Sequence, residues 1–300
     1  MRRAAKERGN HRARSPLLLA TFAAAGALAA GVLLWQLSGD GDGSTGDPGP
    51  VHVHGLGVDP ADGALFVATH SGLYRAAAGE RKAERVGERY QDTMGFTVAG
   101  PNRFLGSGHP DLEEARTKGL PPLLGLIEST DAGETWEPVS LLGEADFHLL
   151  RVAGNRVFGY DASNDRLLVS ADGGRRWNEV RRPAPLVDLA VDPLDGRRLL
   201  VATERGVFAS RDGGQRWTRV SETVGLLAWP RRDRLYLAAG DGRVLASADG
   251  GRRLRARGEI GGRPAALLAG PAGDLYVALH DGTIKRSTDG GSTWAVRSTP

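Results

Sequence analysis

The chain has 300 residues, with 39 basic and 36 acidic side chains, a formal net charge of +3 and no cysteine. Without cysteine, disulfide bridges and thiolate chemistry are excluded, so an exported domain would be stabilised by its core alone. The 43 glycines, 16 prolines and 40% apolar residues are typical of a turn-rich, strand-rich chain with a packed core.

The N-terminal segment has the pattern of a membrane anchor. Residues 1–14 contain six basic side chains and one acidic side chain, and residues 17–35 carry no charge. About 20 apolar residues span the hydrocarbon core of a bilayer, and basic residues flank its cytoplasmic side. We therefore expect a cytoplasmic basic tail over residues 1–14 and a transmembrane anchor over residues 15–37. A signal peptide cleaved near Ala29 is the alternative.

The segment after the anchor predicts an exposed tether that leads to one folded domain. Residues 38–50 consist mostly of Gly, Asp, Ser and Pro and are expected to form a flexible linker. Residues 15–300 carry 33 basic and 35 acidic side chains, so the basic excess of the chain belongs to the tail. Nucleic acid is therefore not an expected partner. We expect a single-pass protein whose domain, residues 51–300, lies outside the cytoplasm.

An eight-residue phrase, Ser-x-Asp-x-Gly-x-x-Trp, recurs five times in this domain. It begins at residues 129, 170, 210, 247 and 287, so successive copies are 37 to 41 residues apart. An Asp in a tight turn accepts bonds from the following N–H groups, and the Gly adopts a left-handed conformation. Apolar runs flank each copy, which predicts a β-hairpin with the Trp on the return strand. The fourth copy ends in Leu254, and we expect its unit to be the least well packed.

The phrase resembles the Asp-box, or BNR, repeat of bacterial sialidase-like β-propellers, over roughly residues 51–300. The resemblance implies an all-β propeller, of a kind often labelled glycosyl hydrolase. In that family the Asp box is a structural turn on the face opposite any active site. The resemblance therefore implies structural roles for Asp131, Asp172, Asp212, Asp249 and Asp289.

Six units of about 40 residues predict six blades of four strands, with seven as the alternative if two units were merged. The first unit lacks the phrase, as terminal repeats often do. Residues 76–90 are expected to form the outer hairpin and an irregular loop of the first blade. Residues 109–122 are expected to be inserted between the second and third strands of the second blade. Long insertions in compact repeat folds are frequently functional.

Polar residues recur where the innermost strands should begin and the second strands should end. In a propeller these two positions lie on the same face, opposite the repeated turns. Imidazoles and carboxylates around a concave mouth suit a ligand or a metal. The sequence therefore predicts a ligand-binding rim on this face, in which a divalent metal could be held by His54, His70, His109 and His148. The expected ligand-binding residues are His52, His54, His70, His109, Asp146, His148, Glu204 and His280. The alternative is that these are solvated strand ends with histidines satisfied by backbone groups.

Three functions are compatible with this rim. In the first, a membrane-anchored propeller binds a glycan or an envelope protein through the first three blades. In the second, suggested by the resemblance, a carboxylate pair hydrolyses a glycosidic bond. The catalytic candidates are Asp92, Asp161, Asp111 and Tyr160. Strict sialidase activity is not expected, because three arginines cannot be placed on the rim and the Arg-Ile-Pro signature is absent. The third function is an envelope assembly scaffold.

Overall fold

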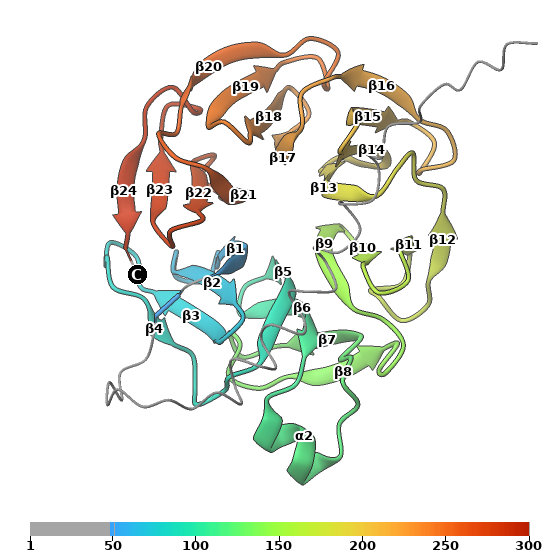
Figure 1. Cartoon of the computed structure of the whole chain (residues 1–300), viewed down its shortest axis with the longest axis vertical. Coiled ribbons are helices and arrows are strands. Elements are labelled where there is room, and N and C mark those ends of the chain that lie inside the picture. The colour runs from blue at the N-terminus through green and yellow to red at the C-terminus, as the bar shows by residue number, and fades with distance from the viewer. Residues whose placement is uncertain (1–48, 51, 300) are drawn as a thin grey trace, which may run out of the picture. The chain divides into compact units, whose positions relative to one another are not determined.

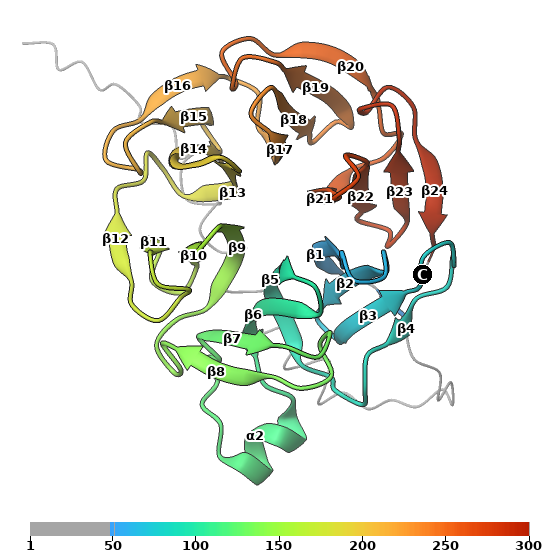
Figure 2. The same ribbon diagram turned by 180° about the vertical axis from the view of Figure 1, so that it is seen from behind.

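The computed structural model describes residues 49–299 except residue 51, and these form a six-bladed β-propeller (Figures 1 and 2). Each blade is a four-stranded antiparallel sheet built from four consecutive strands, with the first strand nearest the central axis. The expected all-β fold with six blades is confirmed. Seven blades are not formed by the described residues.

The first three blades contain the predicted rim. Blade one has β1 (Val53–Val58), β2 (Leu65–Thr69), β3 (Gly72–Ala76) and β4 (Glu84–Arg85). Blade two has β5 (Asp92–Gly100), β6 (Arg103–His109), β7 (Leu126–Ser129) and β8 (Glu137–Ser140). Blade three has β9 (Phe147–Ala153), β10 (Arg156–Asp161), β11 (Arg166–Ser170) and β12 (Asn178–Val180).

The other three blades repeat the same order and complete the ring. Blade four has β13 (Leu186–Asp192), β14 (Asp195–Thr203), β15 (Gly206–Ser210) and β16 (Thr218–Ser221). Blade five has β17 (Gly225–Arg231), β18 (Arg234–Ala239), β19 (Arg243–Ser247) and β20 (Arg255–Glu259). Blade six has β21 (Pro264–Ala269), β22 (Leu275–Leu279), β23 (Ile284–Ser287) and β24 (Ala295–Ser298).

The apolar core lies between neighbouring blades. Every residue of β2 and β22 is buried, because the second strand of a blade is covered on both faces by the adjacent blades. Glycines allow close approaches both between blades and within a blade. A Cβ on Gly95 would lie 2.3 Å from the carbonyl oxygen of Phe147, and one on Gly159 would lie 2.4 Å from the Phe147 ring. A side chain at Gly95, on β5, would push blade two away from blade three, whereas one at Gly159, on β10, would displace the Phe147 ring within blade three.

The five repeated phrases form one and the same turn between the third and fourth strands. In each copy the Ser hydroxyl donates to the Asp carboxylate over 2.8–2.9 Å. It also accepts a bond of 2.8–2.9 Å from the N–H of the second glycine position. That glycine has φ between 85° and 93°, where residues with a Cβ are strained. These turns lie on the face opposite the starts of the inner strands.

The turn that ends in Leu254 has an aromatic neighbour, Trp229. Trp229, on the innermost strand of the same blade, is buried in one core cluster against which Leu254 packs. A Cβ on Gly250 in that turn would lie 3.6 Å from the Trp229 ring. The indole of Trp229 therefore occupies part of the space beside this turn.

Residues 109–122 are inserted where expected and contain the helix α2 (Leu112–Lys118). Asp111 caps the helix, because its carboxylate accepts bonds from the N–H groups of Glu113 and Glu114. Gly119, with φ 64°, ends it. Residues 76–90 are irregular apart from the two-residue strand β4, as expected. No helix among the described residues is long and apolar enough to cross a membrane. The expected tail, anchor and linker, up to residue 48, lie outside the described residues.

Blades one and six close the ring without exchanging a strand. Strand β1 contacts β21 and β22, and the end of β24 lies beside blade one (Figure 1). There Arg297 donates hydrogen bonds to the carbonyl oxygens of Ala77, at 2.9 Å, and Glu80. The hydroxyl of Ser298 donates to the carbonyl oxygen of Arg81 over 2.5 Å. The closure therefore depends on side chains.

Candidate functional site

The central channel opens among the predicted polar residues. A cavity of about 310 Å³ is lined by all six innermost strands, with His54 from β1 and His148 from β9 among its lining residues. Antiparallel order places the starts of the inner strands and the ends of the second strands on the same face. The His and Asp side chains there form the rim cluster, defined as His52, His54, His70, Asp92, His109, Asp146 and His148.

Asp92 connects histidines from two blades. One carboxylate oxygen is 2.9 Å from Nδ1 of His70 in blade one, and the other is 3.4 Å from Nδ1 of His109 in its own blade. Asp92 begins β5 and pairs directly with His109 at the end of β6, so the strand register fixes this contact. The ring of His54 meets the ring of His70 edge-on, with centroids 4.2 Å apart. The centroids of His52 and His70 are 5.8 Å apart.

Asp146 extends the cluster into blade three. Its Oδ2 atom is 2.8 Å from Nε2 of His148 and 4.0 Å from Nε2 of His109. Its backbone N–H donates to the carboxylate of Asp161 over 3.2 Å. The structure therefore joins seven of the sequence-predicted residues into one continuous group across three blades.

Two atoms of the cluster are buried without a hydrogen-bond partner among the described residues. They are Nε2 of His54 and Oδ1 of Asp146. Leaving a buried polar atom unpaired costs about 1–3 kcal/mol, and such atoms in native proteins often serve a function. Burial, together with the neighbouring His70, lowers the pKa of His54 to about 4. His54 is therefore neutral at pH 7 and offers a lone pair.

Contacts between Asp92 and the histidines shift the pKa values of Asp92 and His109. Burial raises the pKa of Asp92, but hydrogen bonds from His109 and His70 outweigh this and hold that pKa at about 2. The hydrogen bond to Asp92, aided by the charge of Asp146, raises the pKa of His109 against the opposing effect of burial. The cluster thus contains an ionised carboxylate, Asp92, and two histidines, His54 and His109, whose pKa values are shifted in opposite directions.

Three of the catalytic candidates have other partners in the structure. Asp161 is 0% exposed and accepts bonds from Asn164 and Arg166, so a sugar cannot reach its carboxylate. Asp111 caps α2. The hydroxyl of Tyr160 donates to Asp165 over 2.6 Å, and burial with this bond raises its pKa to about 12, the opposite of what a tyrosine nucleophile needs. Only Asp92 of the four belongs to the rim cluster.

The last two expected ligand-binding residues are not joined to the cluster. Glu204 and His280 are exposed, in the turns after β14 and β22. No hydrogen bond or ion pair within residues 49–299 connects either side chain to the rim cluster. Both residues follow a second strand, as expected. The carboxylate of Glu222, which precedes β17 in blade five, pairs instead with Arg219 over 3.0 Å.

Sequence reasoning missed a buried ion pair deeper in the channel. Asp188 on β13 accepts hydrogen bonds of 2.7 Å from Arg151 on β9, from its neighbour Leu189 and from the N–H of Leu227 on β17. Burial raises the pKa of Asp188 despite the opposing charge of Arg151. The available signal was a lone acid within the apolar strand 186–191.

A larger cavity, of about 1270 Å³, lies on the opposite face, among the repeated turns. Its lining carries both signs of charge, with Arg231, Arg234 and Arg257 beside Asp233 and Asp249. The lining holds five arginines and four aspartates, so neither sign of charge dominates it. The rim cluster is therefore the stronger candidate site.

Comparison with known proteins gives the fold alone. No family model matches the chain, and no curated protein matches it. Among solved structures, one from the nidogen/laminin complex has a TM-score of 0.61 at 14% identity, covering 79% of this chain and 93% of that one. The WD40 β-propeller domain of Doa1 has a TM-score of 0.57 at 13% identity, covering 85% of each chain. A GH74 xyloglucanase from Xanthomonas campestris has a TM-score of 0.53 at 19% identity, covering 83% of this chain and 45% of that one. The propellers share an architecture that hosts both binding and hydrolysis, so function must be argued from the site.

Proposed function

We propose that this chain is a binding protein whose rim cluster, on the outer side of the cell membrane, engages a protein partner. The observation that carries the proposal is the cluster itself, a continuous group of His and Asp side chains at the mouth of the channel, in which the side chains of His109 and His148 are 41% and 38% exposed. A partner that offers polar groups there would bond to these exposed imidazoles. The anchor expected over residues 15–37 would hold this face outside the cytoplasm.

Apolar side chains beside the cluster favour a protein over a glycan. Tyr90 is 57% exposed and Leu112 is 53% exposed, and the backbone N–H of Tyr90 donates to Asp111 next to Leu112. The guanidinium of Arg85 lies 4.0 Å from the centre of the Tyr90 ring. Exposed aromatic and aliphatic groups next to polar ones are typical of protein interfaces. A similar fold occurs in a chain of the nidogen/laminin complex, which is a precedent for this fold in a complex between proteins.

Hydrolysis is supported less well by the same residues. A glycosidase needs one carboxyl group with a raised pKa as the general acid. Asp92 has a lowered pKa, and Asp161 is buried. Asp188 has a raised pKa but is buried and fully hydrogen-bonded. These three carboxyl groups therefore do not form an accessible pair in which one member has a raised pKa.

Site-specific photo-crosslinking tests the proposal. A photoreactive amino acid is placed at Leu112 and, as a matched control, at Leu194, which is 75% exposed but lies on the opposite face. After irradiation of intact cells, we expect a discrete crosslinked protein from position 112 and none from position 194. Equal crosslinking at both positions, or none at 112, would contradict protein binding at the rim. Glycan-array binding that His70→Ala abolishes would replace the protein partner with a glycan.

The location of the domain is tested separately. Protease added to intact cells is expected to digest residues 51–300 while the chain sediments with membranes. Edman sequencing of the mature protein distinguishes an anchor, which keeps residue 1, from a signal peptide cut near Ala29. A domain that resists protease until the cells are lysed would contradict the proposed location.

A further inference from the structure

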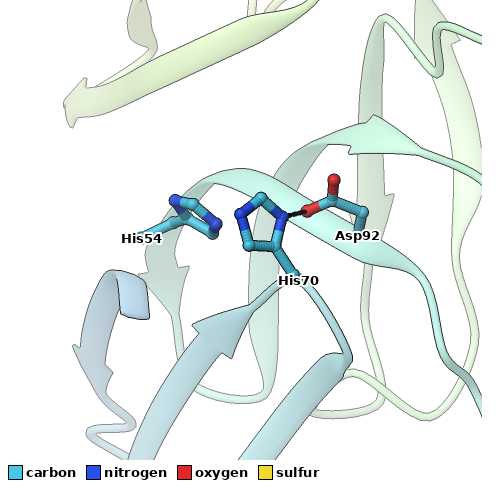
Figure 3. A group of neighbouring side chains, drawn as sticks. All are labelled: His54, His70 and Asp92. Atoms are coloured by element: carbon cyan, nitrogen blue, oxygen red, sulfur yellow. Dashed lines mark hydrogen bonds and ion pairs between the residues drawn. The ribbon is translucent and has the colours of Figure 1, made fainter. Parts of the chain in front are cut away.

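We propose that His54, His70 and Asp92 bind one first-row divalent metal ion of the zinc type at the mouth of the channel. The three residues come from two blades, and Figure 3 shows His70 between the other two. This inference rests on the proposed function and deepens it, because it names a metal ion that the rim would hold when the protein partner binds. Metal binding is nevertheless measured without any partner, so either proposal can fail alone.

The spacing of the three side chains suits a shared ion. Each offers one ligand atom, and these atoms all lie within 4.8 Å of one another. Ligands held at about 2.0–2.1 Å in a tetrahedral zinc site lie roughly 3.3 Å apart, so side-chain rotations that bring the three atoms closer by up to about 1.5 Å would let them share one ion. The rings of His54 and His70 are already in edge-on contact.

The state of His54 points to a missing ligand. Its Nε2 atom is buried and has no hydrogen-bond partner among the described residues. Nδ1 of the neighbouring His70 is bonded to Asp92, and no hydrogen bond joins His70 to Nε2 of His54 within the described residues. A metal ion would use the lone pair of His54 and replace the His70–Asp92 hydrogen bond with two stronger contacts.

The ligand types select the class of ion. Imidazole nitrogens suit zinc, copper, iron and nickel, whereas calcium and magnesium prefer oxygen ligands. Two histidines and one carboxylate leave at least one coordination position open, which could take a side chain of the partner. His109 contacts the second oxygen of Asp92 and would orient that ligand from outside the metal's first shell.

Zinc titration of the full, untagged chain tests the site. The chain is freed of metal with a chelator, which is then removed, and ZnCl₂ is added in competition with a chromogenic zinc indicator. We expect one zinc ion per chain. His54→Gln and His70→Gln should each weaken binding at least tenfold. His280→Gln is the matched control, since His280 is exposed on the same face but is not joined to the cluster, and its affinity should equal that of the wild type.

A measurement on the wild type keeps the proposal testable even if a variant does not fold. X-ray absorption at the zinc edge counts the imidazole ligands, and the proposal requires two. Failure to bind one equivalent of zinc, a spectrum without two imidazoles, or wild-type affinity in folded His54→Gln would overturn the metal site. Zinc binding without crosslinking at Leu112 would leave the metal site standing and overturn the partner.

Discussion

Asp188 joins three blades inside the channel, and its removal gives a sharp test of how the ring is held together. Asp188 is 2% exposed and accepts bonds from Arg151, Leu189 and Leu227. Asp188→Ala leaves two backbone N–H groups without an acceptor, at about 1–3 kcal/mol each. Breaking one half of a buried ion pair costs about 3–5 kcal/mol. Because Arg151 is partly exposed and burial of the carboxylate is itself unfavourable, we expect a net loss near the lower end, about 3 kcal/mol.

The loss is measured as the free energy of unfolding in urea, followed by tryptophan fluorescence at pH 7. The slope of the free energy with urea should stay unchanged, because the surface exposed on unfolding is the same. Glu179→Ala, on the exposed strand β12, is the control and should change stability by less than about 0.5 kcal/mol. If Asp188→Ala is as stable as this control, the carboxylate does not hold the blades together.

The pH dependence of the same comparison has a definite sign. Burial raises the pKa of Asp188 above its ordinary value of 3.8, so the folded chain holds this proton more tightly than the unfolded chain. Protonation of Asp188 therefore stabilises the wild type as the pH falls through the folded pKa toward 3.8. The deficit of Asp188→Ala relative to the wild type should grow over that range. A deficit that shrinks would contradict the raised pKa.

Three further changes probe other parts of the fold. Ser170→Ala removes the acceptor of the buried N–H of Gly174 and should cost about 1–3 kcal/mol in urea unfolding. Tyr160→Phe should remove one late step, near pH 12, from the alkaline absorbance titration, because burial and the bond to Asp165 raise that pKa to about 12. Arg297→Ala removes the bonds to the loop 77–80 and should speed hydrogen exchange in β1 and β24 more than in β13.

Each of these outcomes has a contrary result. Unchanged stability of Ser170→Ala would mean that the Ser hydroxyl is dispensable in the repeated turn. A titration with no step near pH 12 in the wild type would mean that the phenol of Tyr160 is solvated. Exchange that quickens equally in all six blades after Arg297→Ala would mean that the last strand does not close the ring locally.

The architecture was predictable because its signals are local. The Ser, Asp and Gly of each repeated turn act within five residues of one another, so the turn is specified by its own sequence. The spacing of the turns then gives the number of blades. Blade topology places strand starts and strand ends on one face, so the sequence could place His54, His70 and Asp92 on one rim. It did not group these three, because the predicted metal set contained His109 and His148 instead of Asp92, whereas the ligand atoms that lie close together belong to His54, His70 and Asp92.

The roles of individual side chains were less predictable, because they depend on contacts from distant strands. Asp161 lies at a strand end like the rim histidines, but Arg166 and Asn164 enclose it. Asp111 had a readable signal, since an Asp followed by acidic residues in a helical first turn is typical of an N-cap. The hydrogen bond between Asp188 and Leu227 spans 39 residues, and nothing in either segment alone indicates it.

The way the ring closes makes one junction unlike the other five. Elsewhere a covalent linker ties each blade to the next, whereas within the described residues the first and last blades are held by a shared apolar cluster, by packing of β1 on β21 and β22, and by the bonds from Arg297 and Ser298. Thermal breathing of the ring should therefore begin at this junction. His52 and His54 flank it, so any opening would displace them from His148 across the channel. A ligand that bridges the rim would hold this junction closed and so raise the free energy of unfolding of the whole propeller.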